Sequence, residues 1–166
     1  MTRRTLVKES RVAAPTATVW AGFTTAEGLN TELMPMLRLT PPHRSEGPAT
    51  DPVGGGMPLG RSRLLLFGLI PLGHIELRLT ELELGRRFVE RSAMLAMREW
   101  QHERVLEAVD EGCLVRDTVT FEVREPLARI PGVQRAVGGL LRGLFNHRHR
   151  RLTLRHGATE PAAPGS

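Results

Sequence analysis

The chain has 166 residues, of which 40% are hydrophobic and 25% are charged, values typical of a globular protein. This length fits one domain, and the sequence contains no run of 18 apolar residues that could span a membrane. The single cysteine, Cys113, excludes an internal disulfide and a cysteine metal cluster. The N-terminus turns polar again too soon for a signal peptide, so we expect a cytoplasmic protein.

The net charge of +5 is concentrated near the C-terminus. Residues 1–125 carry 16 basic and 17 acidic side chains, whereas residues 126–156 carry seven arginines and no acid. Such a segment can attract an anionic membrane surface or an acidic partner, although 22 of the 23 basic residues are Arg, which also fits an arginine-favouring codon usage. Aromatic residues make up only 4% and Tyr is absent, so we expect no nucleic-acid binding.

The N-terminal quarter predicts a strand, two short helices and a second strand. Residues 5–12 form the strand, and Pro15 suits the first turn of the helix that follows. Gly28 interrupts the helical spacing, and a second helix then extends to Met34. Residues 36–39 are apolar enough for a short strand.

Residues 41–58 are rich in Pro, Gly and Ser and contain few apolar residues. They predict a flexible loop, too short for a domain linker and long for a hairpin. It is either a lid over a site or a surface insertion without function.

The middle of the chain alternates strands and turns, which predicts an antiparallel meander. An apolar run over residues 64–70 is closed by a turn at 71–73, and the turn at 110–112 has hairpin chemistry. The remaining predicted strands are residues 74–84, 88–94, 97–109 and 113–123.

After Pro126 the apolar residues follow steps of three and four up to Leu152, which predicts a long helix opened by Pro131. Gly138, Gly139 and Gly143 weaken this helix by about 1 kcal/mol each and would allow close backbone approach to a sheet. One domain over residues 1–156 is therefore expected, with a disordered tail at 157–166.

No motif for a metal, nucleotide or nucleophile is present, so we expect no cofactor. Residues 54–56 are three glycines, but Met and Pro follow them instead of a phosphate-binding helix start. His147 and His149 stand two apart on the predicted helix, so they point to different sides, and no acid is close to them in the sequence. We expect no metal site.

Two neighbouring strands carry an unusual polar cluster. With period two, Trp100, His102 and Arg104 share one face of their strand. Asp117 lies on the otherwise apolar face of the next strand, so it should point inward, where a buried carboxylate needs a partner. Arg104 falls opposite it across the turn, which predicts an inward ion pair with His102 and Trp100 beside it. This pair either orients a polar ligand or fixes the strand register.

Glu90 and Arg148 raise the same question. Glu90 shares a strand face with Phe88 and Ser92, and Arg148 interrupts the apolar stripe of the long helix after Phe145. Arg148 either reaches into the interior or extends to solvent from the edge of the helix.

The order strand, two helices, meander and long terminal helix resembles the α+β helix-grip fold of the SRPBCC superfamily, which includes START-like, polyketide cyclase/dehydrase and lipid-transport proteins. The resemblance spans residues 5–153. Its motifs are Ser10-x-Val12-x-Ala14-Pro15 with Val19-Trp20 and Phe23, Trp100-x-His102, Asp117-x-Val119-x-Phe121, and Leu144-Phe145-x-x-Arg148-x-x-x-Leu152.

The resemblance implies a curved antiparallel sheet around the terminal helix and an apolar cavity that binds or carries a small hydrophobic molecule. The alternatives are a cyclase or dehydrase that uses His102 and Asp117, and an interaction module that uses the basic terminal helix. Relatives often carry Tyr where this chain has Phe121, which makes aromatic cyclisation chemistry less expected here. The expected cavity residues are Trp100, His102, Arg104, Asp117, Val119, Phe121, Leu141, Phe145 and Arg148.

Overall fold

The computed structural model describes residues 3–41, 57–94 and 96–159. The elements follow one another in the order that the sequence predicts, with one additional 3-10 helix, η1, before the terminal helix. They are β1 (Arg4–Val12), α1 (Thr16–Phe23), α2 (Ala26–Leu33), β2 (Leu37–Leu39), β3 (Met57–Leu66), β4 (Ile70–Glu83), β5 (Arg87–Met94), β6 (Met97–Val109), β7 (Gly112–Val123), η1 (Leu127–Arg129) and α3 (Val133–His156).

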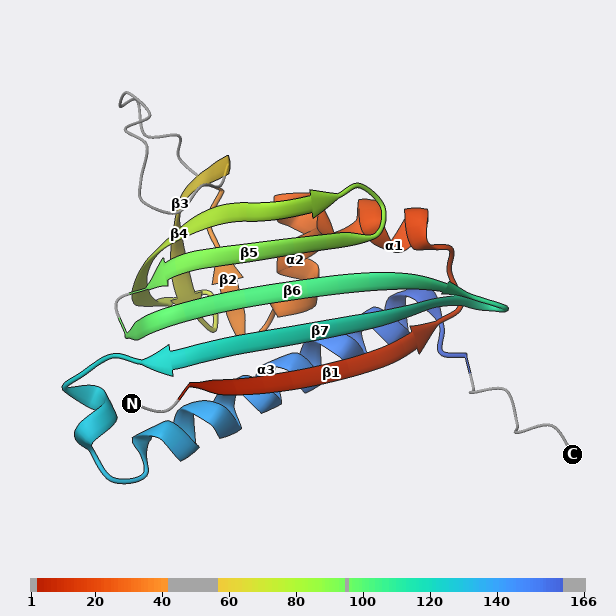
Figure 1. Ribbon diagram of the computed structural model, residues 1–166. Helices are drawn as coiled ribbons and strands as arrows, with labels where there is room; N and C mark the ends of the chain where they lie inside the picture. Colours follow the sequence, from red (N-terminus) through yellow and green to blue (C-terminus); the bar gives the residue numbers. More distant parts are fainter. Residues whose placement is uncertain (1–2, 42–56, 95, 160–166) are drawn as a thin grey trace, which may run out of the picture.

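The seven strands form one antiparallel sheet in the order β1-β7-β6-β5-β4-β3-β2. The sheet is curled into a half-barrel, and α3 runs along the side of β1 and β7 (Figure 1). Helices α1 and α2 connect the two edge strands of the sheet, and α2 also contacts α3. The predicted α+β helix-grip fold is confirmed.

Strand alternation decides which side chains enter the interior. Along β7 every second residue is buried, from Cys113 to Val123, because the opposite face of the strand looks outward. In the register of β6 and β7, Arg104 lies opposite Asp117 and His102 lies opposite Val119. The polar cluster expected from the sequence therefore faces the interior of the half-barrel.

The turn between β3 and β4 lies earlier than the sequence predicts. Phe67 and Gly68 adopt positive φ angles of 52° and 72° and reverse the chain, so the apolar run does not continue as one strand to Ile70. Pro71 lies inside β4, opposite Leu65, next to a register shift between Leu64 and Leu65. The prediction of a turn at residues 71–73 was wrong. The observed turn is made mostly of apolar residues, so it lacks the polar residues that usually mark a turn in the sequence.

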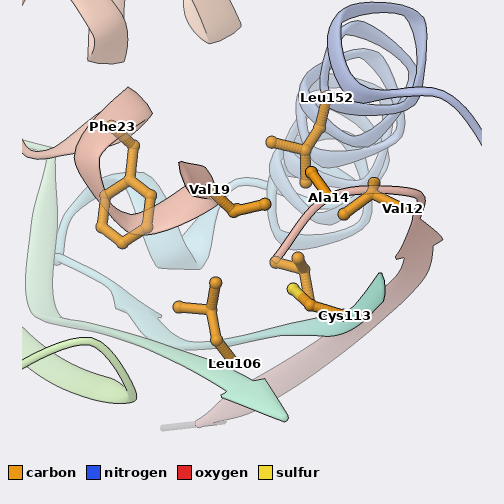
Figure 2. Close-up of a cluster of buried hydrophobic side chains, with 8 residues drawn as sticks. Val12, Ala14, Val19, Phe23, Leu106, Cys113 and Leu152 are labelled. Carbon is orange, nitrogen blue, oxygen red and sulfur yellow. The ribbon is translucent and has the colours of Figure 1, made fainter. Parts of the chain in front are cut away.

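A hydrophobic core cluster joins α1, α3 and the end of the sheet where β6 turns into β7. Figure 2 shows these side chains meeting between the two helices and the strands. Trp20 and Phe88 pack against the edge of the cluster. The buried members are Val12, Ala14, Val19, Phe23, Leu106, Cys113, Val115 and Leu152.

The ends of α3 differ slightly from the prediction. Gly132 is the N-cap, with φ of 84°, so Pro131 precedes the helix instead of opening it. After the helix, the backbone of Gly157 accepts a hydrogen bond from Ala13, and Ala158 forms a bridge with Val12. The predicted disordered tail therefore does not start at Gly157, and residues 160–166 lie outside the described part.

The predicted loop at 41–58 extends too far at its C-terminal end. Met57 and Pro58 belong to β3, and residues 42–56 lie outside the described part of the chain. Among the described residues, no helix combines the length and apolarity needed to cross a membrane.

Candidate functional site

The centre of the site is an ion pair between β6 and β7. Arg104 donates from Nε to Asp117 Oδ1 and from Nη2 to Asp117 Oδ2, both at 2.7 Å. The exposed fraction is 0% for Arg104 and 1% for Asp117, so the pair is removed from solvent. The inward orientation of Asp117 and its pairing with Arg104 are confirmed.

A second carboxylate, which the sequence analysis missed, completes the pairing of Arg104. Glu32, in the last turn of α2, accepts from Arg104 Nη1 at 3.0 Å and from Nη2 at 2.9 Å. Arg148 of α3 donates from Nη2 to the same carboxylate at 3.0 Å. Glu32 and Arg148 are 4% and 5% exposed. Buried charges thus connect the sheet, α2 and α3.

Two histidines flank Asp117 on opposite sides. His102 Nε2 lies 2.9 Å from Oδ1, and His149 Nε2 lies 2.9 Å from Oδ2. His149 of α3 also contacts the Ser10 hydroxyl of β1 through Nδ1 at 2.9 Å. The acid that His149 contacts is 32 residues away in sequence, so the absence of an acid close to it in the sequence did not reveal this contact. His147 instead contacts a backbone oxygen, that of Met34.

The protonation pattern follows from the state of Asp117. An ionised carboxylate only accepts hydrogen bonds, so His102 Nε2 and His149 Nε2 must both carry the proton that faces it. In neutral His102 the lone pair is then on Nδ1, on the side away from Asp117. In neutral His149 the Nδ1 lone pair accepts the Ser10 hydroxyl. Among the ring nitrogens of these two histidines, only His102 Nδ1 makes no hydrogen bond to Asp117 or Ser10.

Burial and charge act in opposite directions on the two carboxyls. Burial has the largest single effect and would raise both pKa values. At Asp117 the interactions with Arg104 and His102 outweigh the effect of burial, and they hold the pKa of that carboxyl well below its ordinary value. Arg104 and Arg148 likewise keep the pKa of Glu32 below its ordinary value. Burial would lower the pKa of Arg104, but the two carboxylates raise it, so all three groups stay charged.

On the side of β5, His102 faces a smaller polar group. Its Nδ1 lies 4.0 Å from Glu90 Oε2, and the Ser92 hydroxyl donates to the same carboxylate through Oε1. The rings of Phe88 and Phe145 meet the imidazole edge-on, with centroids at 5.3 and 5.4 Å. His102 thus stands between the buried ion pairs and a second polar pair further out on the sheet.

The apolar residues predicted to line a cavity pack against one another. Val119, Phe121, Leu141 and Phe145 are buried members of one core cluster, and half-buried Trp100 packs on its edge. The cluster meets the polar residues at the Phe145 ring, which lies 5.0 Å from the guanidinium carbon of Arg148. All nine predicted residues therefore belong to one contiguous interior region, with the apolar ones in close contact.

Two surface depressions occur elsewhere in the described part of the chain. One, of about 400 Å³, lies beside the start of α1 and the β6–β7 turn, and one of about 240 Å³ lies at the N-terminal end of α3. None of the nine predicted residues lines either depression. Within the described residues, no group of three or more His, Cys, Asp and Glu side chains is arranged to hold a metal ion.

Solved structures of the same fold cover nearly the whole chain. The aromatase/cyclase ZhuI from Streptomyces sp. R1128 matches with a TM-score of 0.68 and 14% identity, covering 99% of this chain and 100% of the other. A START superfamily protein from Mycobacterium smegmatis matches with a TM-score of 0.58 and 15% identity, covering 92% and 98%. One half of the di-domain ARO/CYC StfQ from the steffimycin biosynthetic pathway matches 92% of this chain with a TM-score of 0.64 and 12% identity.

These likenesses establish the START-like, SRPBCC-type fold expected from the sequence. At such low identity they establish the fold alone. No curated protein sequence matches the chain significantly. The model of one family matches residues 10–156, nearly the entire folded domain, and the chain therefore belongs to the family described as domain of unknown function DUF8410.

Proposed function

We propose that the domain binds a small hydrophobic molecule, lipid-like or polyketide-like, between the inner face of the sheet and α3. The observation that carries this proposal is that Ser62 Oγ on β3 and Arg148 Nε on α3 are buried hydrogen-bonding atoms with no protein partner among the described residues. The same holds for Arg4 Nε and Thr159 Oγ1. A buried polar group without a partner costs about 1–3 kcal/mol. The polar head of a ligand would satisfy such groups.

The packing of side chains on the inner face of the sheet also supports a binding site in this region. Val119 on β7 is 1% exposed, whereas Leu77 and Leu79 on β4 are only half-buried although they share that face. Leu79 lies directly opposite Glu90 in the sheet register. An apolar tail could therefore lie on β4 with its head near Glu90 and His102.

Ligand entry would require side chains to move. The apolar residues around Phe145 are in contact with one another, so a ligand of lipid size must move α3 away from β7 or displace half-buried side chains. During this movement the ion pair between Glu32 and Arg104 would keep the C-terminal end of α2 attached to β6. This is a prediction of local opening around a fixed polar centre.

Energy transfer from tryptophan to a dansylated C11 fatty acid tests binding. In the Trp20→Phe variant the emission comes from Trp100 alone, at the edge of the proposed site. We expect saturable transfer at one probe per chain, and about tenfold weaker binding in Leu79→Asn than in the parent, from lost apolar contact. Leu84→Asn, at a turn position that is 82% exposed, is the control and should bind as the parent does.

Native mass spectrometry of the purified protein, followed by organic extraction, adds an independent readout. A co-purifying hydrophobic molecule, or saturable probe binding sensitive to Leu79→Asn, supports the proposal. If neither a co-purifying molecule nor saturable binding is found, the proposal is wrong.

A cyclase or dehydrase activity is a second candidate, favoured by the contact between His102 and Asp117. Asp117 would fix the tautomer and orientation of the imidazole, and His102 Nδ1 would accept a proton from a substrate carbon or hydroxyl. Glu90 lies on that same side of the ring.

Turnover of a poly-β-keto thioester analogue would test this activity. Loss of turnover in His102→Ala, with an unchanged circular dichroism spectrum and melting temperature, supports it. Probe binding without turnover in the parent protein leaves a binding role and removes the enzyme.

A further inference from the structure

The β3–β4 hairpin ends in a group of strongly exposed apolar side chains. Phe67 is 59% exposed, Leu69 83%, Ile70 55% and Leu72 47%. We call these four residues the apolar tip. Contiguous exposed apolar surface of this kind is rare on isolated soluble domains and marks a site of interaction.

The backbone holds the tip in a defined turn. Leu69 N–H donates to Leu66 O at 3.1 Å, and Phe67 N–H donates to Met36 O at 2.9 Å, which ties the turn to the chain before β2. Two other turns between strands have every residue described. The turn between β6 and β7 is polar, with Asp110 and Glu111, and the turn between β4 and β5 carries one strongly exposed apolar residue, Leu84, between polar neighbours. Neither turn carries a group of four exposed apolar side chains as the tip does.

Two exposed arginines lie on the strands next to the tip. Arg38 and Arg63 are exposed, and Arg38 Cδ lies 3.8 Å from the position that a Cβ on Gly68 would take. In the register, Arg38 is opposite Leu65, and Arg63 is opposite His74. Within the described residues neither arginine forms an ion pair with a carboxylate, and both side chains are exposed.

We propose that the apolar tip inserts into the interface of an anionic lipid bilayer while Arg38 and Arg63 contact lipid phosphates. Apolar side chains at a protruding turn can enter the headgroup boundary, and each nearby arginine adds attraction to an anionic surface. Leu69, the most exposed of the four, would enter deepest. The protein would bind such a membrane peripherally and reversibly.

The proposal does not depend on ligand binding in the interior. Its residues lie on β2, β3, β4 and the connecting turn, and none of them belongs to the ion-pair network or to the predicted cavity residues.

Co-sedimentation with vesicles of phosphatidylcholine, with and without 25% phosphatidylglycerol, tests this docking surface. We expect binding to the anionic vesicles in about 0.1 M salt that weakens as salt is raised. The double variant Leu69→Ser/Ile70→Ser should reduce partitioning onto anionic vesicles about tenfold or more. The control variant Leu84→Ser should not reduce it, although Leu84, at 82% exposed, is about as exposed as Leu69. Arg38→Gln and Arg63→Gln should each reduce it about fivefold, and Arg86→Gln should not.

A fluorescence readout separates insertion from non-specific attraction by the arginines of α3. In a Trp20→Phe/Trp100→Phe background, Phe67→Trp should shift its emission to shorter wavelength when anionic vesicles are added, and Leu84→Trp should not.

Several results would overturn the proposal: no binding to either vesicle, binding undiminished by Leu69→Ser/Ile70→Ser, or no spectral shift of Phe67→Trp. So would sedimentation velocity that shows a dimer dissociated by Leu69→Ser/Ile70→Ser without vesicle binding, because the tip would then be a contact between two copies of the chain.

Discussion

Glu32 and Arg104, 72 residues apart in the chain, form a two-point ion pair in the interior, with N–O distances of 3.0 and 2.9 Å. The same guanidinium holds Asp117 through two further hydrogen bonds. Four of its five N–H groups can thus be assigned to carboxylate oxygens, and the Phe23 ring centroid lies 4.7 Å from its central carbon. One arginine therefore links α1, α2, β6 and β7.

Removing the charge of Glu32 should destabilise the fold strongly. In Glu32→Gln the buried guanidinium of Arg148 loses its anionic partner and Arg104 loses one of two, so we expect about 3–5 kcal/mol less free energy of unfolding. Urea denaturation monitored by circular dichroism measures this change. Glu27→Gln, on the exposed side of the same helix, should cost less than about 1 kcal/mol. Equal losses in the two variants would contradict a stabilising role for the network.

The ion pairs also predict a loss of stability in acid. The pKa values of Asp117 and Glu32 are lowered in the folded protein, against about 3.9 and about 4.3 in an unfolded chain. The unfolded state therefore binds protons first, so the stabilisation is complete above about pH 5 and is lost as the pH falls below 4.

The melting temperature measured between pH 7 and pH 3 should follow this course, with the steepest decline below pH 4.5. In Glu32→Gln one of the two titrating groups is gone, so the decline should be shallower from a lower starting value. A parent protein whose stability does not change down to pH 3 would be inconsistent with the lowered pKa values.

Strand alternation explains why the Arg104–Asp117 pair could be predicted. The period of two is local, and the turn at residues 110–112 fixes the register, so opposite residues follow from counting. The inner positions of β7 were identified in the same way. The long helix and the meander were recognisable for the same reason, since each has a periodic pattern over more than ten residues.

Glu32, His149 and the β3–β4 turn escaped prediction because their positions depend on distant packing. Glu32 stands on an eight-residue helix whose sequence does not show which side meets the sheet. His149 reaches Asp117 only because α3 lies against β1 and β7. The turn at Phe67 and Gly68 is formed by the apolar residues that also continue a strand pattern.

Cys113 should be unreactive in the folded protein. It is 0% exposed, and burial raises the pKa of its thiol to about 11, although the charge of Arg104 acts in the opposite direction. The thiolate that attacks a disulfide reagent is therefore scarce at pH 8. Reaction with 5,5′-dithiobis(2-nitrobenzoate) should be at least about 100-fold slower in buffer than in 6 M guanidinium chloride, where the thiol is free. Rapid labelling in buffer would show that the core around Cys113 opens readily.

Two glycine substitutions should change stability in opposite directions. Gly112 begins β7 with φ of 145°, and a Cβ there would lie 2.0 Å from the backbone oxygen of Val12. Gly112→Ala should therefore lower the free energy of unfolding by more than about 2 kcal/mol, since β1 or the β6–β7 turn must move. Gly139, in contrast, is exposed on α3, and a Cβ there meets no described atom within 4 Å.

Gly139→Ala should raise the free energy of unfolding by about 1 kcal/mol, because alanine favours the helix and nothing obstructs it. Gly143 is also exposed with open space around it, so the expectation that both glycines allow close approach to the sheet was wrong; only Gly138 is buried, next to Phe121. Urea denaturation of the two alanine variants beside the parent measures both effects. If Gly139→Ala destabilises the protein, the surface of α3 around residue 139 must be covered in solution, and the intrinsic preference of alanine for helix no longer decides the outcome.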